Sequence, residues 1–115
     1  MGGRKILIVS SDYSFASILE RELGSDYEVH SAATDIAAFA LLDMYQYGCL
    51  VIDLSSRSIA GSATVAGLRL SALTLPVVAL VPPRSEITLP ERSLVCVADG
   101  DPIPRVAALV REAAR

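Results

Sequence analysis

No stretch of this chain stays hydrophobic for the roughly 18 residues that a membrane-spanning helix needs, although 52% of its 115 residues are hydrophobic. The first five residues, MGGRK, lead directly into a short apolar run, so we expect no signal peptide and no membrane partner.

Excess positive charge is also missing, because the formal net charge is −3. That balance argues against direct nucleic-acid binding by this domain. The length fits a single domain, residues 1–115.

Cysteine is scarce as well. Cys49 and Cys96 both lie inside apolar, strand-like runs, which is typical of buried thiols in a reducing compartment. We therefore expect a cytoplasmic protein with two free cysteines rather than a redox pair.

Residues for nucleophilic or phosphate chemistry are also few. A serine nucleophile needs a base, and His30, the only histidine, falls on a predicted edge strand with no evident orienting partner. A glycine-rich phosphate loop is absent, because Gly2 and Gly3 precede the first apolar run instead of following it. We expect no enzymatic activity, and an enzymatic or small-ligand-binding domain is kept as an alternative.

The sequence CLVIDL at 49–54 organises the rest of the chain. Its continuous apolar, β-branched character predicts a strand buried on both faces, as in parallel sheets. A carboxylate directly after such a run does not serve packing, since burying an unpaired charge is costly. Asp53 is therefore predicted to lie at the carboxyl end of a central strand, where open α/β sheets place their functional residues. Its alternative role is purely structural, capping the loop that follows.

Strands and helical segments alternate along the chain. Strands are predicted at 5–9, 27–31, 49–54, 76–81 and 94–97. The first helix has Phe15, Ile18, Leu19 and Leu23 at helical spacing and Gly24 at its end, and the second runs over 34–45 with Ile36, Ala37, Ala40, Leu41 and Met44 on one side and Gly48 closing it. A polar loop at 55–61, a third helix near 65–72 and a final helix from 103 complete the pattern. Pro90 leaves a fourth helix between 84 and 93 at most short or irregular.

This alternation predicts an α/β fold of the flavodoxin-like (βα)5 type, a three-layer sandwich around a parallel five-stranded sheet in the order 2-1-3-4-5. Right-handed crossovers then place the first and last helices on one face and the others on the opposite face. Because the fourth strand separates the third and fifth, the two cysteines are too far apart for a disulfide.

In this order and spacing the sequence resembles the receiver domains of bacterial response regulators, the CheY-like family of two-component signalling. The features that carry the resemblance are KILIV at the start, VID ending at Asp53, Gly61 eight residues later, LPVVAL at 75–80 and a proline before the last helix. The resemblance covers essentially the whole chain. It implies that Asp53 corresponds to the phosphoacceptor, which takes a phosphoryl group from a histidine kinase.

The resemblance also implies a site of which this chain retains only part. Receivers hold Mg²⁺ with the phosphoacceptor and an acidic pair after the first strand, and that pair falls on Ser10 and Ser11, with Asp12 one residue further on. The hydroxyl that follows the fourth strand falls on Val81. The lysine that follows the fifth strand falls near Ala98 to Asp101, and Lys5 is the only lysine in the chain.

These substitutions predict that phosphorylation at Asp53 is very slow or absent. A phosphoryl group adds about −1.5 to −2 charges, and each charge-assisted hydrogen bond that could support it is worth on the order of 1.5–3 kcal/mol. Asp101 in the lysine position would repel the group. The interpretation we favour is a pseudo-receiver that acts by protein–protein interaction, without a cofactor and stable without a cation. The alternative is an atypical phosphoreceiver that binds Mg²⁺ weakly through Asp12 and Asp53.

The distribution of charge is consistent with a binding role. Residues 31–83 hold only five charged side chains, namely Asp35, Asp43, Asp53, Arg57 and Arg69, against eighteen in the other 62 positions. This segment supplies the second and third helices on one face, and a charge-poor helical face is a candidate interface. A histidine kinase or an output domain is the partner that the resemblance implies, and a homodimer is an alternative.

Overall fold

The computed structural model describes residues 4–54, 75–81, 94–97 and 103–114, with the backbone alone at 94–97. Five parallel strands form one sheet: β1 (Lys5–Val9), β2 (Glu28–Ala32), β3 (Cys49–Asp53), β4 (Val77–Val81) and β5 (Leu94–Val97). Their order, β2-β1-β3-β4-β5, confirms the predicted topology. The described helices are α1 (Tyr13–Leu23), α2 (Asp35–Met44) and α4 (Ile103–Ala113).

Four of the predicted features fall on residues outside these ranges. They are the loop at 55–61 with Gly61, the third helix, the irregular fourth helix between 84 and 93, and Asp101. Within the described ranges, no helix is long and apolar enough to cross a membrane.

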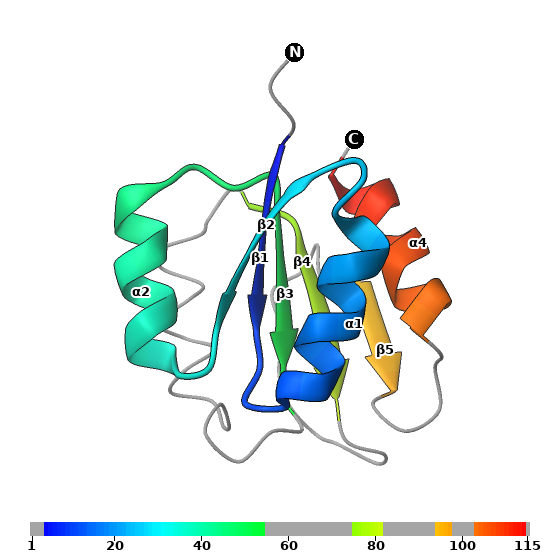
Figure 1. Ribbon diagram of the computed structural model, residues 1–115, viewed down its shortest axis with the longest axis horizontal. Coiled ribbons are helices and arrows are strands. Elements are labelled where there is room, and N and C mark those ends of the chain that lie inside the picture. The colour runs from blue at the N-terminus through cyan, green and yellow to red at the C-terminus, as the bar shows by residue number, and fades with distance from the viewer. Residues whose placement is uncertain (1–3, 55–74, 82–93, 98–102, 115) are drawn as a thin grey trace.

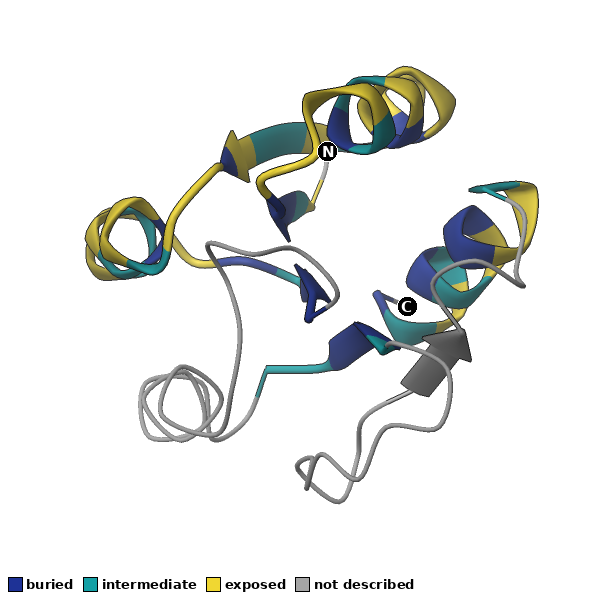
Figure 2. Ribbon diagram, turned by 90° about the horizontal axis from the view of Figure 1, so that it is seen from below, coloured by how far each residue is buried: buried dark blue, intermediate teal, exposed yellow. Residues whose placement is uncertain are grey.

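The helices cover the two faces of the sheet as the crossover rule predicts. In Figure 1, α2 lies on one side of the sheet, and α1 and α4 lie on the other. Figure 2 shows the same three layers from below. Contacts between α1 and α4 close the layer on their side. Each face of the sheet therefore has its own hydrophobic core.

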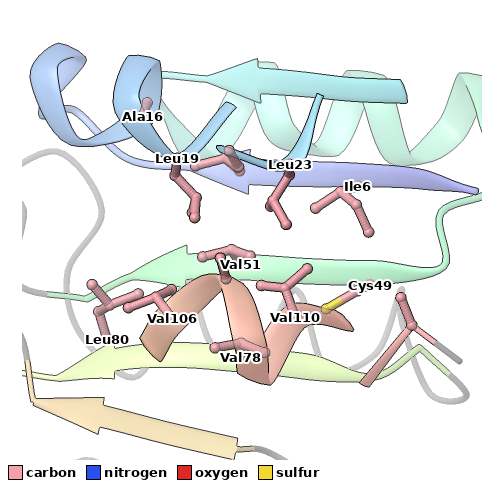
Figure 3. Packing of buried hydrophobic residues seen from close by; sticks show 13 residues of the cluster. Ile6, Ala16, Leu19, Leu23, Cys49, Val51, Val78, Leu80, Val106 and Val110 are labelled. Atoms are coloured by element: carbon pink, nitrogen blue, oxygen red, sulfur yellow. The ribbon is translucent and has the colours of Figure 1, made fainter. Parts of the chain in front are cut away.

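The core under α1 and α4 is the larger one. Alternate residues of the central strands point into it, among them Ile6, Val51 and Val78, all fully buried. Leu19 of α1 and Val110 of α4 meet them from the helical side, as Figure 3 shows. Burial of side chains of this size contributes about 1.5–3 kcal/mol each. This layer fixes β1 and β3 side by side, with their carboxyl ends at the same edge.

Local signals set the ends of α1. Asp12 is its N-cap, with φ −86° and ψ 99°, and its side chain accepts a hydrogen bond from the Phe15 amide. The helix ends at Leu23 as predicted, and a Cβ on Gly24 would lie 3.0 Å from the carbonyl oxygen of Glu20. Of the four apolar residues at helical spacing, Leu19 and Leu23 are fully buried, whereas Ile18 is 49% exposed.

The prediction for α2 was wrong in one respect. The helix ends at Met44, with Tyr45 as its C-cap, so Gly48 does not close it. Gly48 instead begins the approach to β3, where its amide donates to the Lys5 carbonyl over 2.7 Å. The side on which the sequence groups the apolar residues of this helix is mostly its outer side. Only Ala38 of α2 is fully buried, and the residues of the predicted apolar side that are exposed are Ile36, Ala37, Ala40 and Met44.

Candidate functional site

Asp53 lies at the carboxyl end of β3, in the middle of the sheet, as the sequence predicts. Its backbone is in register with Leu80 of β4, and the next amide, of Leu54, donates to the Leu80 carbonyl over 2.8 Å. The Asp53 side chain is only 4% exposed. A carboxylate buried to this extent needs hydrogen-bond donors to replace the water it leaves.

Ser10 supplies such a donor. In the register of β1 and β3, Val9 pairs with Ile52, so Ser10 and Asp53 follow at adjacent positions. The Ser10 hydroxyl donates a hydrogen bond of 2.7 Å to Oδ2 of Asp53. The same oxygen of Ser10 accepts from the Asp12 amide at 3.0 Å. Ser10 is itself 4% exposed, so the pair forms a buried polar contact at the carboxyl edge.

Ser11 and Asp12 do not join Ser10 in the interior. Both are exposed. Oδ1 of Asp12 accepts a hydrogen bond of 3.1 Å from the Phe15 amide at the start of α1. Among the residues that the structure describes, no three His, Cys, Asp or Glu side chains are grouped so that they could hold a metal ion. The contact of Asp12 therefore serves the helix, and Mg²⁺ binding by Asp12 and Asp53 stays a prediction.

Two further positions of the receiver site were predicted, one for a hydroxyl at Val81 and one for a lysine near Asp101. Neither adds a polar group to the described part of the site. Val81 ends β4 and is half-buried, packed against the core on the α2 side of the sheet. It presents methyl groups where receivers have a hydroxyl. Asp101 lies outside the described residues. Lys5, the only lysine, begins β1, and its ammonium group lies 3.6 Å from the Glu28 carboxylate. Lys5 therefore lies at the opposite end of the sheet from Asp53.

A second polar cluster, which the sequence analysis missed, surrounds His30 on β2. Nδ1 of His30 lies 2.7 Å from the Tyr47 hydroxyl, and Nε2 lies 3.2 Å from Oε2 of Glu28. The His30 ring also meets the Tyr45 and Tyr47 rings edge to face, with centroids 4.8 and 5.5 Å apart. The expectation that His30 has no orienting partner was wrong. Its partners Tyr45 and Tyr47 lie fifteen and seventeen residues later in the chain, so no local sequence pattern indicates these contacts.

Burial changes two acid groups near the sheet. Desolvation raises the pKa of the Tyr47 hydroxyl to about 12, with smaller contributions from the charges of Tyr45 and Glu28. Desolvation likewise raises the pKa of the Cys49 thiol to about 12, against a smaller lowering by a hydrogen bond with the Val78 backbone. Cys49 is a buried free thiol, and its strand is separated from β5, which carries Cys96, by β4. The strand order agrees with the predicted separation of the two cysteines.

The fold is that of receiver domains. A structure described as adenylate cyclase from Rhodopirellula baltica matches with a TM-score of 0.78 and 18% identity, over 97% of this chain and 87% of that chain. The chemotaxis response regulator CheY4 of Vibrio cholerae matches with a TM-score of 0.76 and 17% identity, over 96% and 98% of the two chains. The receiver domain of the hybrid histidine kinase CckA matches with a TM-score of 0.77 and 20% identity, over 96% and 99%.

The likeness is structural rather than sequential. No protein-family model matches the sequence, and no curated protein matches it. The chain nevertheless spans nearly the full length of the receiver domains that it superposes on, which agrees with the predicted flavodoxin-like topology.

Proposed function

We propose that this chain is a receiver-type module of two-component signalling that acts by binding a protein partner, without phosphorylation of Asp53 and without catalysing a reaction. The observation that carries the proposal is the buried hydrogen bond of 2.7 Å between the Ser10 hydroxyl and Oδ2 of Asp53.

That contact opposes metal binding at this site. A divalent cation such as Mg²⁺ prefers carboxylate oxygens, and Ser10 offers a neutral hydroxyl whose proton already points at Asp53. Asp12, the carboxylate that follows Ser10 most closely in the sequence, caps α1 with one of its oxygens. The described residues at this edge therefore do not fit a Mg²⁺ site, and without a cation little offsets the charge of an incoming phosphoryl group.

The remaining support for a phosphoryl group is also absent from the described part of the site. Val81 offers methyl groups instead of a hydroxyl donor. Lys5 is paired with Glu28 at the far end of β1. With each missing charge-assisted hydrogen bond on the order of 1.5–3 kcal/mol, a phosphorylated state of Asp53 would be strongly disfavoured.

The geometry also argues against hydrolytic chemistry. Ser10 and Ser11 are the candidate nucleophiles, and His30 is the only histidine that could act as a base. Ser11 is exposed, and Ser10 is buried. Alternation along the strands places Ser10 on the same side as Ile6 and Ile8, under α1, whereas His30 lies beside Tyr47 on the α2 side. The sheet therefore separates the two side chains, and the Ser10 hydroxyl is bonded to a carboxylate instead of an imidazole.

A binding role requires an interface, and the outward face of α2 offers one. Ile36 and Met44 are 78% and 69% exposed on this helix. A histidine kinase or an output domain in the cytoplasm is the class of partner that the receiver fold suggests.

The direct test is incubation with acetyl phosphate and Mg²⁺, followed by intact-mass measurement, with Asp53→Asn as the matched control. We expect no added phosphoryl mass on either protein. The second test adds beryllofluoride and Mg²⁺ and records backbone amide NMR spectra. We expect the amide resonances of residues 10–12 and 53–54 to keep their chemical shifts. Stoichiometric phosphorylation that Asp53→Asn abolishes would instead establish the atypical phosphoreceiver.

A further inference from the structure

Apolar side chains form a continuous stripe on the outside of α2. Ile36, Ala40 and Met44 follow one another at intervals of four residues, so they lie along one ridge of the helix. All three are exposed. Figure 2 shows the outward side of this helix coloured as exposed, with its buried residues turned to the sheet. Isolated exposed apolar residues are ordinary, but a ridge of three on one helix is a patch.

The shape of the ridge suits another helix. Large side chains stand at its two ends, and Ala40 lies between them, with Ala37 beside it on the same exposed side. A small residue at the centre allows a second helix to approach closely, while the large residues at the ends fit beside it. Helix-in-groove and helix-on-helix recognition both use such anchors, spaced three or four residues apart.

The charged side chain on this face of α2 is negative. Asp43 is exposed next to the ridge, and α2 carries no basic residue at all. Asp43 also lies in the last turn, where the helix dipole already places partial negative charge on the final carbonyl groups. The C-terminal half of the ridge is therefore both apolar and negative, which is complementary to an apolar side chain flanked by lysine or arginine.

The aromatic cluster holds this end of α2 in position. The Tyr45 ring, at the C-cap, meets the His30 ring of β2 edge to face, and His30 is in turn bonded to the Tyr47 hydroxyl. The C-terminal end of the helix is therefore fixed to the sheet before any partner arrives, so that less freedom is lost on binding.

We propose that the Ile36–Ala40–Met44 ridge with Asp43 is a docking site for an amphipathic helix of a partner protein that carries basic residues beside its apolar stripe. A second copy of this chain is a poorer occupant, because its own ridge brings another aspartate and no cation. The inference rests on the proposed function in one respect: it names the partner class of a module that acts by binding.

The test uses a helical peptide of about eighteen residues with a leucine stripe flanked by lysines, and an otherwise identical peptide with glutamates in place of the lysines. Amide NMR of the whole chain measures the binding of each peptide. We expect the lysine peptide to shift amides of α2 and Tyr45, and the glutamate peptide to bind at least about tenfold more weakly. Equal binding of both peptides, or none, would overturn the proposal.

Matched variants locate the site. Ile36→Ala and Met44→Ala should each weaken binding of the lysine peptide about tenfold, as expected for anchor residues, and Asp43→Asn should reduce both the affinity and its salt dependence. Ile18→Ala is the control, because Ile18 is an exposed isoleucine of α1 on the other side of the sheet. An equal loss in Ile18→Ala would show nonspecific hydrophobic binding and contradict the assignment.

Light scattering of the chain alone tests the second copy as occupant. A dimer that Met44→Ala dissociates would replace our proposal with self-association, whereas a monomer at peptide-binding concentrations supports it. These outcomes are independent of the phosphorylation assay. Phosphorylation of Asp53 would refute the proposed function and leave the peptide result standing, and failure of the peptide to bind would do the reverse.

Discussion

The Ser10 hydroxyl and the Asp53 carboxylate share a hydrogen bond of 2.7 Å, with both side chains only 4% exposed. We predict that Ser10→Ala lowers the free energy of unfolding by about 1.5–3 kcal/mol, the range for a hydrogen bond to a charged group. Urea denaturation measures the change. Ser14→Ala, at an exposed position of α1, is the control and should change stability by less than about 0.5 kcal/mol. Equal effects of the two substitutions would mean that the Ser10 contact adds no stability.

Restoring an acidic residue should make the same site depend on a cation. Ser10→Asp removes the hydroxyl donor and places a second carboxylate beside Asp53, so the like charges should lower the melting temperature in EDTA. Mg²⁺ should raise the melting temperature again, because its binding adds about 2.7 kcal/mol to the free energy of unfolding at a concentration one hundred times the dissociation constant. The unmodified protein should melt at the same temperature with and without Mg²⁺. A clear rise in the unmodified protein would instead reveal a metal site of its own.

Cys49 should make the protein less stable at high pH. Burial raises the pKa of its thiol from 9.0 to about 12 in the folded protein, so the unfolded chain releases this proton first as the pH rises. The contribution to stability is complete below pH 9 and is lost between pH 9 and 12, at up to about 1.4 kcal/mol per pH unit. Urea denaturation at pH 8, 9, 10 and 11 should show a shallower decline for Cys49→Ala than for the unmodified chain. Parallel curves for the two proteins would contradict the assignment to this thiol.

The sheet could be predicted from the sequence because its strands are marked by local patterns. Runs such as the one that precedes Asp53 are apolar at every position, as expected of a strand covered on both faces. Topology then followed from short connections and right-handed crossovers. The same reasoning placed Asp53 at the carboxyl edge of the sheet, and the resemblance to receivers placed Ser10 beside it, where the structure has it.

Contacts between side chains distant in sequence could not be predicted in this way. The hydroxyl of Tyr47, in the segment between α2 and β3, lies 2.7 Å from Nδ1 of His30, a residue seventeen positions earlier in the chain. The side of α2 that faces the sheet could not be predicted for a related reason: the helix is apolar around most of its circumference, so periodicity does not identify that side. Ala38 proved to be the buried residue of this helix.

Two aspartates of α2 should respond to substitution with opposite signs. Asp35 lies in the first turn, where negative charge is favoured by the helix dipole, and Asp43 lies in the last turn, where it is disfavoured. We predict that Asp35→Asn lowers the free energy of unfolding by about 0.3–1 kcal/mol at low salt and that Asp43→Asn raises it by a similar amount. Urea denaturation at low and high salt measures both, and the differences should shrink as salt screens the charges. If Asp43→Asn proves destabilising, Asp43 contributes to the stability of the fold, and the helix-dipole argument for this position is contradicted.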